Sequence, residues 1–412
     1  MPEKRRLQIE RLGAQGDGVA KTDAGSVFVA FALPGETVDA VVEAERGRLA
    51  SVVAPSRQRV QPVCEHFGRC GGCALQHYDA EAYRSWKRGL VATALSMRGI
   101  EADVAPLVGV GLGSRRRAAL TARREGAGVR IGFHEAGSNA LVDLQVCHVL
   151  APEIVKLLPG LRELLKLLVG SPSEARLHVL LAENGLDVDV SGNSAKLSPG
   201  ARAALAEAAA ALGLVRLSLD GDPLFQSGVP LVRAGAAQIV PPPGTFLQAS
   251  AEAEALISKL VVGAFGKRSR QAADLFCGVG AFSFALASKA KVLAIDNDRS
   301  AIEALEEAKR RTQGVRAIET RLRDLFQEPL ARKELEPFDL VLFDPPRGGA
   351  KAQAEMLAKS KVVTVAAVSC NPATLARDLR IMIDGGYRLE SVTPIDQFLF
   401  THHVEVVAVL RR

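Results

Sequence analysis

The segment Asp274-Leu275-Phe276-Cys277-Gly278-Val279-Gly280 joins a short apolar stretch, residues 272–276, to a stretch of helical character. Glycines at such a point let the backbone turn tightly and approach a ligand closely. Further apolar stretches at 291–295, 338–343 and 361–369 alternate with helical ones. This alternation predicts a mostly parallel sheet covered by helices.

The regions on either side of this segment complete the predicted architecture. Residues 388–395 and 403–410 predict an antiparallel strand pair at the edge of the sheet. Pro241-Pro242-Pro243-Gly244 breaks the chain upstream. Short strand-like segments with Gly-rich turns near the N-terminus predict a small five-stranded barrel, a shape that commonly binds nucleic acid. The predicted fold is multidomain α/β: an OB-type β-barrel at 1–53, a mixed α+β central domain at 54–250 and a Rossmann-like domain at 251–412.

The composition fits a globular protein with a polyanionic partner. The 412 residues are 48% apolar and 24% charged, which argues against extensive disorder. The formal charge of +6 suits RNA, although many cytoplasmic proteins are mildly basic. No apolar run approaches the roughly 18–20 residues that cross a bilayer, and the N-terminus lacks a signal sequence. We therefore expect a cytoplasmic protein without membrane contact.

Acidic residues after successive strands predict a nucleoside site beside the glycine turn. Asp296 follows the second strand and can accept hydrogen bonds from both hydroxyls of a ribose. Ser283 occupies the place of the third glycine in a dinucleotide-binding pattern, which favours a cofactor without a pyrophosphate, such as S-adenosylmethionine. Asp324 is placed either to accept from an adenine amino group or to cap a helix.

Two further motifs lie at the carboxyl ends of predicted strands, where ligands bind in such sheets. Asp344-Pro345-Pro346-Arg347 follows the fourth strand, and Ser369-Cys370-Asn371-Pro372 ends the fifth. A lone cysteine is usually a buried structural residue, but polar neighbours and a proline indicate that Cys370 is accessible. Glu405 precedes the last strand and is either a base facing the same cleft or a solvent-facing edge residue.

Together, the motifs at 274–278, 344–347, 369–372 and 403–405 resemble the RNA (uracil-5-)-methyltransferase family in order and spacing. Residues 7–53 are similar to its N-terminal TRAM barrel. The resemblance implies that Cys370 adds to C6 of a uracil, that C5 then accepts a methyl group, and that Glu405 removes the C5 proton. It also implies that the uridine is flipped out of any stack. The cofactor contacts that it implies are Gln248, Phe276, Gly278, Asp296, Asp324 and Asp344, and Asp344 also lies near the reacting uracil.

The cysteines Cys64, Cys70, Cys73 and Cys147 supply four thiolates. Zinc and a [4Fe–4S] cluster both accept four such ligands. Zinc sites usually combine two C-x-x-C pairs, and only one is present, so the spacing favours the cluster. The pattern also resembles the iron–sulfur-containing ribosomal RNA branch of the family.

Arginines at 115–124 alternate with small apolar residues at strand spacing. We expect these arginines to hold RNA phosphates or stack on bases, with a solvated surface as the alternative. The residues predicted to bind RNA are Arg115, Arg116, Arg117 and Arg123.

The prediction is therefore a monomeric enzyme that methylates a specific uridine of 23S ribosomal RNA. Two other functions are weighed against it: methylation of a transfer RNA uridine, and a non-catalytic iron–sulfur protein that binds RNA. A nicotinamide dehydrogenase is disfavoured by Ser283.

Overall fold

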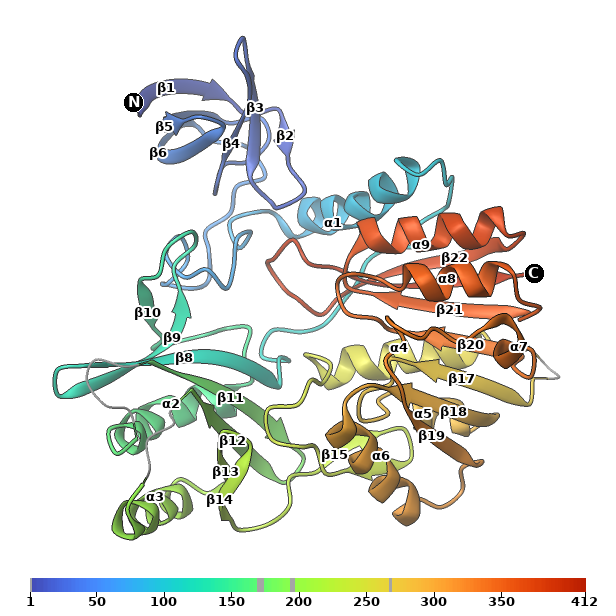
Figure 1. The fold of residues 1–412 in the computed structure, drawn as a ribbon. Helices are drawn as coiled ribbons and strands as arrows, with labels where there is room; N and C mark the ends of the chain where they lie inside the picture. Colours follow the sequence, from blue (N-terminus) through green and yellow to red (C-terminus); the bar gives the residue numbers. More distant parts are fainter. Residues whose placement is uncertain (1, 169–173, 193–196, 267–268) are drawn as a thin grey trace.

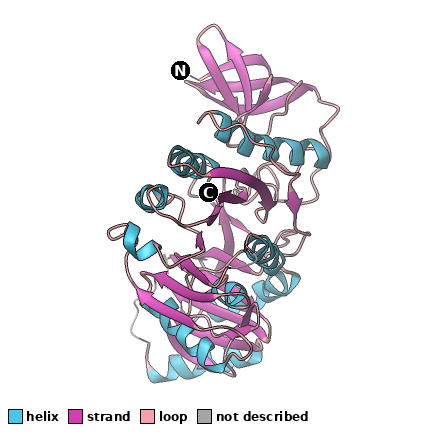
Figure 2. Ribbon diagram, turned by 90° about the vertical axis from the view of Figure 1, so that its right-hand side faces the viewer, coloured by secondary structure: helices cyan, strands magenta, loops and turns pink. Residues whose placement is uncertain are grey.

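The computed structural model describes residues 2–168, 174–192, 197–266 and 269–412, which form three sheet-containing units (Figure 1). The N-terminal unit projects from the remainder of the molecule, as Figure 2 shows. Among the described residues, no helix has the length and apolar character to cross a membrane.

The N-terminal unit is a curled sheet. Its strands are β1 (Glu3–Gln8), β2 (Arg11–Leu12), β3 (Gly18–Thr22), β4 (Gly25–Val29), β5 (Thr37–Glu43) and β6 (Arg46–Ala54). They pair in the order β1-β5-β6-β4-β3-β2. The two edges, β1 and β2, follow each other directly in the chain, and between them the Glu10 N–H donates to the Val19 carbonyl at 2.9 Å. The sheet therefore closes on itself, and β1 and β2 act as one bent strand.

The central unit is a sheet with helices on one face. Its elements are β8 (Arg117–Glu125), β9 (Gly128–His134), β10 (Leu141–Asp143), α2 (Pro152–Leu165), β11 (Glu174–Ala182), β12 (Gly185–Ser191), α3 (Pro199–Ala211), β13 (Leu214–Leu219) and β14 (Asp222–Gln226). The strand order is β10-β9-β8-β11-β12-β13-β14. Leucines of α2, among them Leu158 and Leu161, pack on this sheet with Leu205 of α3. A hairpin of β15 (Val232–Ala234) and β16 (Ala237–Ile239) then leads to the C-terminal unit.

The C-terminal unit is a doubly covered, mostly parallel sheet. Its strands are β17 (Gln271–Leu275), β18 (Lys291–Asp296), β19 (Ile318–Leu322), β20 (Leu340–Phe343), β21 (Thr364–Ser369), β22 (Arg388–Asp396) and β23 (Glu405–Arg411). Its helices are α4 (Ala251–Gly263), α5 (Ser283–Ala287), α6 (Arg299–Arg311), α7 (Arg332–Leu335), α8 (Lys351–Ala358) and α9 (Pro372–Asp384). Neighbouring strand residues face opposite cores: Ala272 packs with α4, α5 and α6, and Ala273 with α8 and α9. Both faces are apolar, as parallel strands require.

The last two strands and an upstream segment complete this sheet. β23 runs antiparallel between β21 and β22, so the predicted antiparallel pair is present. β22 is not the edge, because β7 (Val108–Gly109) pairs with it. The helix α1 (Ala80–Ser96) also packs here, with Val91 and Leu95 in the core that contains α8 and α9. Residues 80–109, predicted to belong to the central domain, therefore pack with the C-terminal unit because their apolar faces complete its core.

Candidate active site

The turn after β17 has a backbone that glycine alone adopts without strain at two positions. Gly278 and Gly280 have φ angles of 53° and 89°. A Cβ on Gly280 would lie 2.7 Å from the Leu305 side chain, so this glycine permits close packing of α6. A Cβ on Gly278 would meet no atom within 4 Å. The turn is thus packed on one side and open to a ligand on the other.

Two acidic residues predicted at this site accept hydrogen bonds from backbone N–H groups. Asp296 accepts from the Gly278 N–H at 2.8 Å and from the Asp298 N–H at 2.9 Å, which fixes the turn. Asp324 accepts from the Phe326 N–H at 2.9 Å and caps a turn. The helix cap weighed for Asp324 is therefore not found, because residues 325–327 form a turn and the next helix, α7, begins at Arg332. Each carboxylate keeps further lone pairs for a ligand.

Ser283, at the place of a third glycine, has a structural partner. Its hydroxyl donates to Asp274 Oδ2 at 2.5 Å, and both side chains are fully buried. Burial raises the pKa of Asp274 to about 7, and the nearby Asp344 and Asp296 carboxylates add to the rise. The serine therefore ties the start of α5 to β17.

An aromatic pair borders the turn, of which Phe276 was predicted as a cofactor contact and Phe326 was not. The rings of Phe276 and Phe326 lie 5.2 Å apart between centroids. Phe276 has a φ of 63°, which is strained for a residue with a Cβ. Phe326 is 46% exposed although it is aromatic. In the sequence, the available signal was a phenylalanine two residues after Asp324.

Three predicted reactive residues converge at the carboxyl edge of the sheet. Asp344 follows β20, Cys370 follows β21, and Glu405 begins β23. The parallel register pairs Phe343 with Ala367, and the antiparallel register pairs Ser369 with Val406. The next positions along β21 and β23 are Cys370 and Glu405, so the register sets them side by side.

Two buried amides connect the carboxylates. Gln248 donates from Nε2 to Asp344 Oδ2 at 3.0 Å. Gln397 donates from Nε2 to Gln248 Oε1 at 2.7 Å and to Glu405 Oε2 at 2.8 Å. Gln248, predicted from the resemblance as a cofactor contact, thus lies between the acids of the reaction site. Gln397 was not singled out in the sequence, because an amide in a connecting loop carries no motif.

Burial controls the protonation of this site. It raises the pKa of Glu405 to about 7, partly offset by the Gln397 hydrogen bond. Burial and the Glu405 charge raise the pKa of Asp344 well above its usual range. The same two causes raise the pKa of the Cys370 thiol, and Arg347 opposes them. The thiol is therefore protonated at neutral pH in the protein without RNA.

The loop that follows Asp344 is tied to the cysteine loop. Asn371 caps α9 by accepting from the Ala373 N–H at 3.1 Å, and it donates from Nδ2 to the Arg347 carbonyl at 3.1 Å. The exposed Arg347 side chain lies 2.9 Å from His403 Nε2. Burial, His402 and Arg347 lower the pKa of His403 to about 3, so its imidazole is neutral.

Proteins similar in sequence to this chain include RNA methyltransferases. A family model described as tRNA (Uracil-5-)-methyltransferase matches residues 240–412, and a TRAM domain model matches residues 3–50. A protein named as an uncharacterized RNA methyltransferase from Brucella suis biovar 1 is 47% identical over 98% of this chain and 97% of its own. A 23S rRNA (uracil(1939)-C(5))-methyltransferase from Chromohalobacter salexigens is 34% identical over 98% of this chain and 89% of its own. The chain belongs to the RNA (uracil-5-)-methyltransferase family.

A solved relative shares the fold of this family member. The crystal structure of Pyrococcus abyssi tRNA (uracil-54, C5)-methyltransferase in complex with S-adenosyl-L-homocysteine has a TM-score of 0.77 and 22% identity. It covers 98% of this chain, which covers 99% of it. The predicted class, a TRAM barrel with a Rossmann-like methyltransferase domain, is confirmed. The chain is an RNA-modifying enzyme that uses S-adenosylmethionine as methyl donor.

The four clustered cysteines line one cavity of about 260 Å³ together with His402 and His403. None of the four, namely Cys64, Cys70, Cys73 and Cys147, forms a disulfide. Burial, with smaller effects from the other three cysteines, raises the pKa of Cys73 to about 12. Among the residues that the structure describes, no group of three or more His, Cys, Asp or Glu side chains is arranged to hold a single metal ion.

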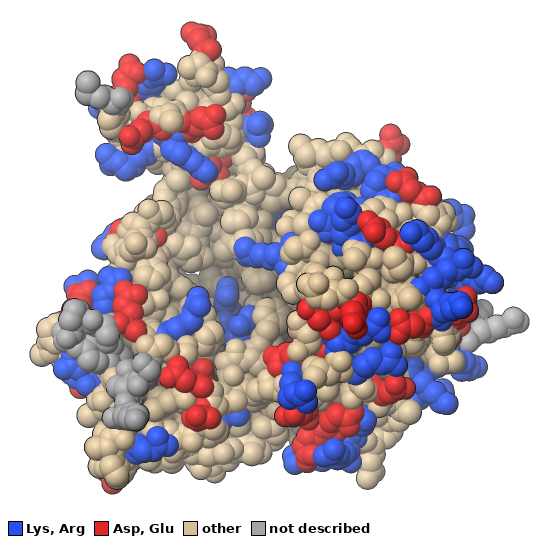
Figure 3. All heavy atoms as spheres, in the orientation of Figure 1, with Lys and Arg blue, Asp and Glu red and all other residues tan. Residues whose placement is uncertain are grey.

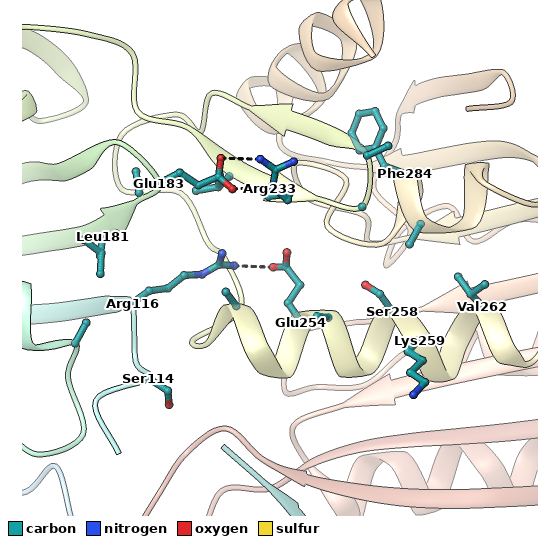
Figure 4. A pocket seen from close by; sticks show the side chains of 18 of the residues that line it. Ser114, Arg116, Leu181, Glu183, Arg233, Glu254, Ser258, Lys259, Val262 and Phe284 are labelled. Atoms are coloured by element: carbon teal, nitrogen blue, oxygen red, sulfur yellow. Dashed lines mark hydrogen bonds and ion pairs between the residues drawn. The ribbon is translucent and has the colours of Figure 1, made fainter. Parts of the chain in front are cut away.

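The predicted RNA-binding arginines have divergent surroundings. Arg116 is buried and pairs with Glu254 of α4 at 2.8 Å, beside a cavity of about 990 Å³ (Figure 4). Arg123 pairs with Glu174 and donates to the Asn139 carbonyl. Both guanidinium groups have partners within the protein, and a contact of either with RNA stays a prediction.

The remaining two arginines lie on either side of Arg116 in the sequence. Arg115 donates to the Arg117 carbonyl at 3.0 Å and lines the cysteine cavity. The Arg117 guanidinium lies 4.7 Å from the ring centre of Phe246, which is 65% exposed. Arg117 is therefore the member of the stretch whose side chain faces an exposed aromatic surface.

Proposed function

We propose that this enzyme methylates C5 of a uridine in 23S ribosomal RNA through covalent attack by Cys370. The observation that carries the proposal is the placement of Cys370 beside Glu405, with Asp344 at the same sheet edge. The Chromohalobacter salexigens relative, whose name specifies 23S rRNA, supports ribosomal RNA as the target.

The side chains account for each step of the reaction. Cys370 loses its proton to solvent, and the thiolate adds to uracil C6, which makes C5 an enolate-like nucleophile. When bound, S-adenosylmethionine would supply an electrophilic methyl group: C5 would form the new bond as the methyl–sulfonium bond breaks and a neutral thioether leaves. Glu405 then accepts the C5 proton, the C5–C6 double bond returns, and the Cys370 sulfur leaves. The high pKa of Cys370 fits a thiolate formed once RNA has bound, with Arg347 favouring the charge.

The residues of the glycine turn fit the methyl donor. Gly278 leaves the space that a close nucleoside needs, and Asp296 and Asp324 offer acceptors beside it. The Phe276–Phe326 pair offers an apolar face on which a purine ring can stack.

The test uses ribosomal RNA and transfer RNA transcripts in which 5-fluorouridine replaces uridine. Fluorine at C5 cannot leave as a cation, so the reaction should stop at a covalent protein–RNA adduct that survives denaturation. We expect this adduct with 23S rRNA in the presence of S-adenosylmethionine. An adduct with transfer RNA alone would assign the enzyme to that substrate. If neither RNA gives an adduct, the covalent mechanism is wrong.

We also propose that Cys64, Cys70, Cys73 and Cys147 hold a [4Fe–4S] cluster. Four thiols around one cavity match its ligand set, and the cavity of about 260 Å³ exceeds the roughly 30 Å³ that one water occupies. The Gly71 N–H, in the loop that carries three of the cysteines, donates to the His134 carbonyl of β9 at 2.9 Å. A cluster in this cavity would add a second link between that loop and the central unit. Anaerobic purification should give about four irons per chain. A protein that contains only zinc would contradict this.

The RNA surface is proposed to include the N-terminal barrel and Arg117. Lysine and arginine atoms lie on the walls of a hollow between the units in Figure 3, which suits a phosphate backbone. The boundaries 1–53, 54–250 and 251–412, the cytoplasmic location, the flipped uridine and the monomeric state stay predictions.

A further inference from the structure

Gln397 occupies a position between the two reactive carboxylates. It follows the last residue of β22, and its side chain is 2% exposed. A buried amide in a connection between strands must find partners for its oxygen and both hydrogens. Those partners reveal its role.

The orientation of the Gln397 amide is determined by the backbone. Its Oε1 accepts from the Ala249 N–H at 3.1 Å, which can only donate. Its Nε2 therefore faces Gln248 Oε1 at 2.7 Å and Glu405 Oε2 at 2.8 Å, and both groups accept. A flipped amide would set oxygen against oxygen at two contacts and a hydrogen donor against the backbone N–H.

This orientation passes to the rest of the network. Because Gln248 Oε1 accepts from Gln397, Gln248 Nε2 must point to Asp344 Oδ2, 3.0 Å away. One backbone N–H thus orders two amides and two carboxyls. The side chain of Gln397 is the only described link that joins Glu405 to this chain of hydrogen bonds.

The two carboxylate oxygens of Glu405 differ in their hydrogen bonds. Oε2 accepts from Gln397, whereas Oε1 is buried and has no hydrogen-bond partner among the described residues. A buried acceptor without a partner is costly and calls for a functional explanation. With Oε2 fixed, the free lone pairs of Oε1 keep a single direction.

We propose that Gln397 is a positioning residue for proton removal: it holds Glu405 so that Oε1 is the acceptor of the C5 proton. This inference rests on the proposed covalent mechanism. Gln397 itself touches neither the substrate nor the reacting atoms. Its loss should slow the step after methyl transfer more than the attack of Cys370.

The loop around Gln397 has other anchors, so this side chain can be changed without releasing the loop. Asp396 accepts from Lys87 Nζ at 2.5 Å and from the Tyr83 hydroxyl at 2.6 Å. The Phe400 carbonyl accepts from the Ala74 N–H at 2.8 Å. A folded variant with an altered catalytic step is therefore expected.

The test is Gln397→Met, which keeps the side-chain length and removes the donors. Loss of a hydrogen bond to a charged group should lower kcat about 10- to 100-fold, with KM for RNA little changed. The decisive readout uses ordinary 23S rRNA and S-adenosylmethionine labelled in the methyl group. Slow proton removal should make a labelled, denaturation-resistant protein–RNA adduct accumulate, whereas the wild type turns over without it.

Gln353→Met is the matched control. Gln353 is 1% exposed and lies away from the reaction site. Its Oε1 accepts from the Leu330 N–H, and its Nε2 donates to the Leu330 carbonyl. We expect it to keep the wild-type kcat and to form no adduct on ordinary RNA. Equal adduct formation by both variants would show a general effect of removing a buried amide and would overturn the inference.

The outcomes separate this inference from the proposed mechanism. If wild-type protein forms no adduct with 5-fluorouridine RNA, the mechanism itself fails. If it does, but Gln397→Met loses kcat without accumulating adduct on ordinary RNA, the mechanism stands and the positioning role is refuted. Gln397→Glu, which keeps the acceptor for the Ala249 N–H, should show the same accumulation as Gln397→Met. Wild-type behaviour of Gln397→Glu would also refute it.

Discussion

Two regions of the chain have sequences that look equally functional: the carboxyl edge of the C-terminal sheet and the arginine stretch at 115–124. The structure brings the residues of the first together in one site and separates those of the second. At the sheet edge, strand register brings Asp344, Cys370 and Glu405 together. In the stretch, Arg116 and Arg123 find partners on other elements. Residues at the ends of adjacent strands converge by topology, whereas the role of a charged residue within a strand depends on what packs against it.

The largest expected effect breaks the sheet edge at its nucleophile. Cys370→Ala should lower kcat by at least about a thousandfold, because uracil C5 is not activated without addition at C6. Binding of S-adenosyl-L-homocysteine should be retained, since the glycine turn and Asp296 are unchanged. Single-turnover methylation and calorimetry measure the two properties. Normal turnover would remove Cys370 from the reaction.

The second effect concerns the protonation of Glu405. Its pKa of about 7 means that the carboxylate able to accept a proton is lost as pH falls below 7. The breakdown of the transient adduct on ordinary RNA, captured by rapid quenching within a single turnover, should therefore slow about tenfold per pH unit below 7 and level off above it. In the adduct Cys370 no longer titrates, which leaves Asp344 as the other titratable group facing Glu405 among the described residues.

The same experiment sharpens the role of Gln397. Because its hydrogen bond lowers the pKa of Glu405, Gln397→Met should move the falling limb to higher pH. A profile for the wild type that is flat between pH 5 and 8 would contradict Glu405 as the base.

The features that could be predicted from the sequence are those that the order of strands in the sheet determines. The strand alternation from residue 272 onwards and the motifs at strand ends were sufficient to place Asp344 and Cys370 at one edge. Glu405 was assigned to that edge only by the family resemblance. The sequence could not predict Gln397, because its function depends on Ala249 and Gln248, almost 150 positions away. Nor could it predict the partner of Arg116, since Glu254 has no pattern relation to it.

A third effect tests the arginine side of the comparison. Arg116→Met leaves Glu254 buried without its cation, which should cost about 3 kcal/mol of stability near pH 8. The cost should shrink at pH 6, because the pKa of Glu254, already raised to about 7 by burial, lets it bind a proton. Thermal unfolding at both pH values measures this. Arg116→Met with Glu254→Gln should recover most of the loss, and no recovery would mean that the pair is not the cause.

The smallest effect concerns Arg117, which forms no ion pair with the described residues and lies over an exposed ring. Arg117 lies over Phe246, and burial lowers its pKa to about 10, so it stays charged at neutral pH. Arg117→Ala should weaken RNA binding about tenfold, whereas Arg123→Ala, which breaks an internal pair, should change it little.

The dependence of this loss on salt identifies the kind of contact. A phosphate contact would reduce the slope of log affinity against log salt by about one, whereas stacking of a base on Arg117 and Phe246 would leave the slope nearly unchanged. Because Arg117 already lies against an exposed ring, we expect the second result. Equal losses of RNA affinity for Arg117→Ala and Arg123→Ala would mean that an ion pair within the protein does not keep an arginine from binding RNA. The contrast with the sheet edge would then fail.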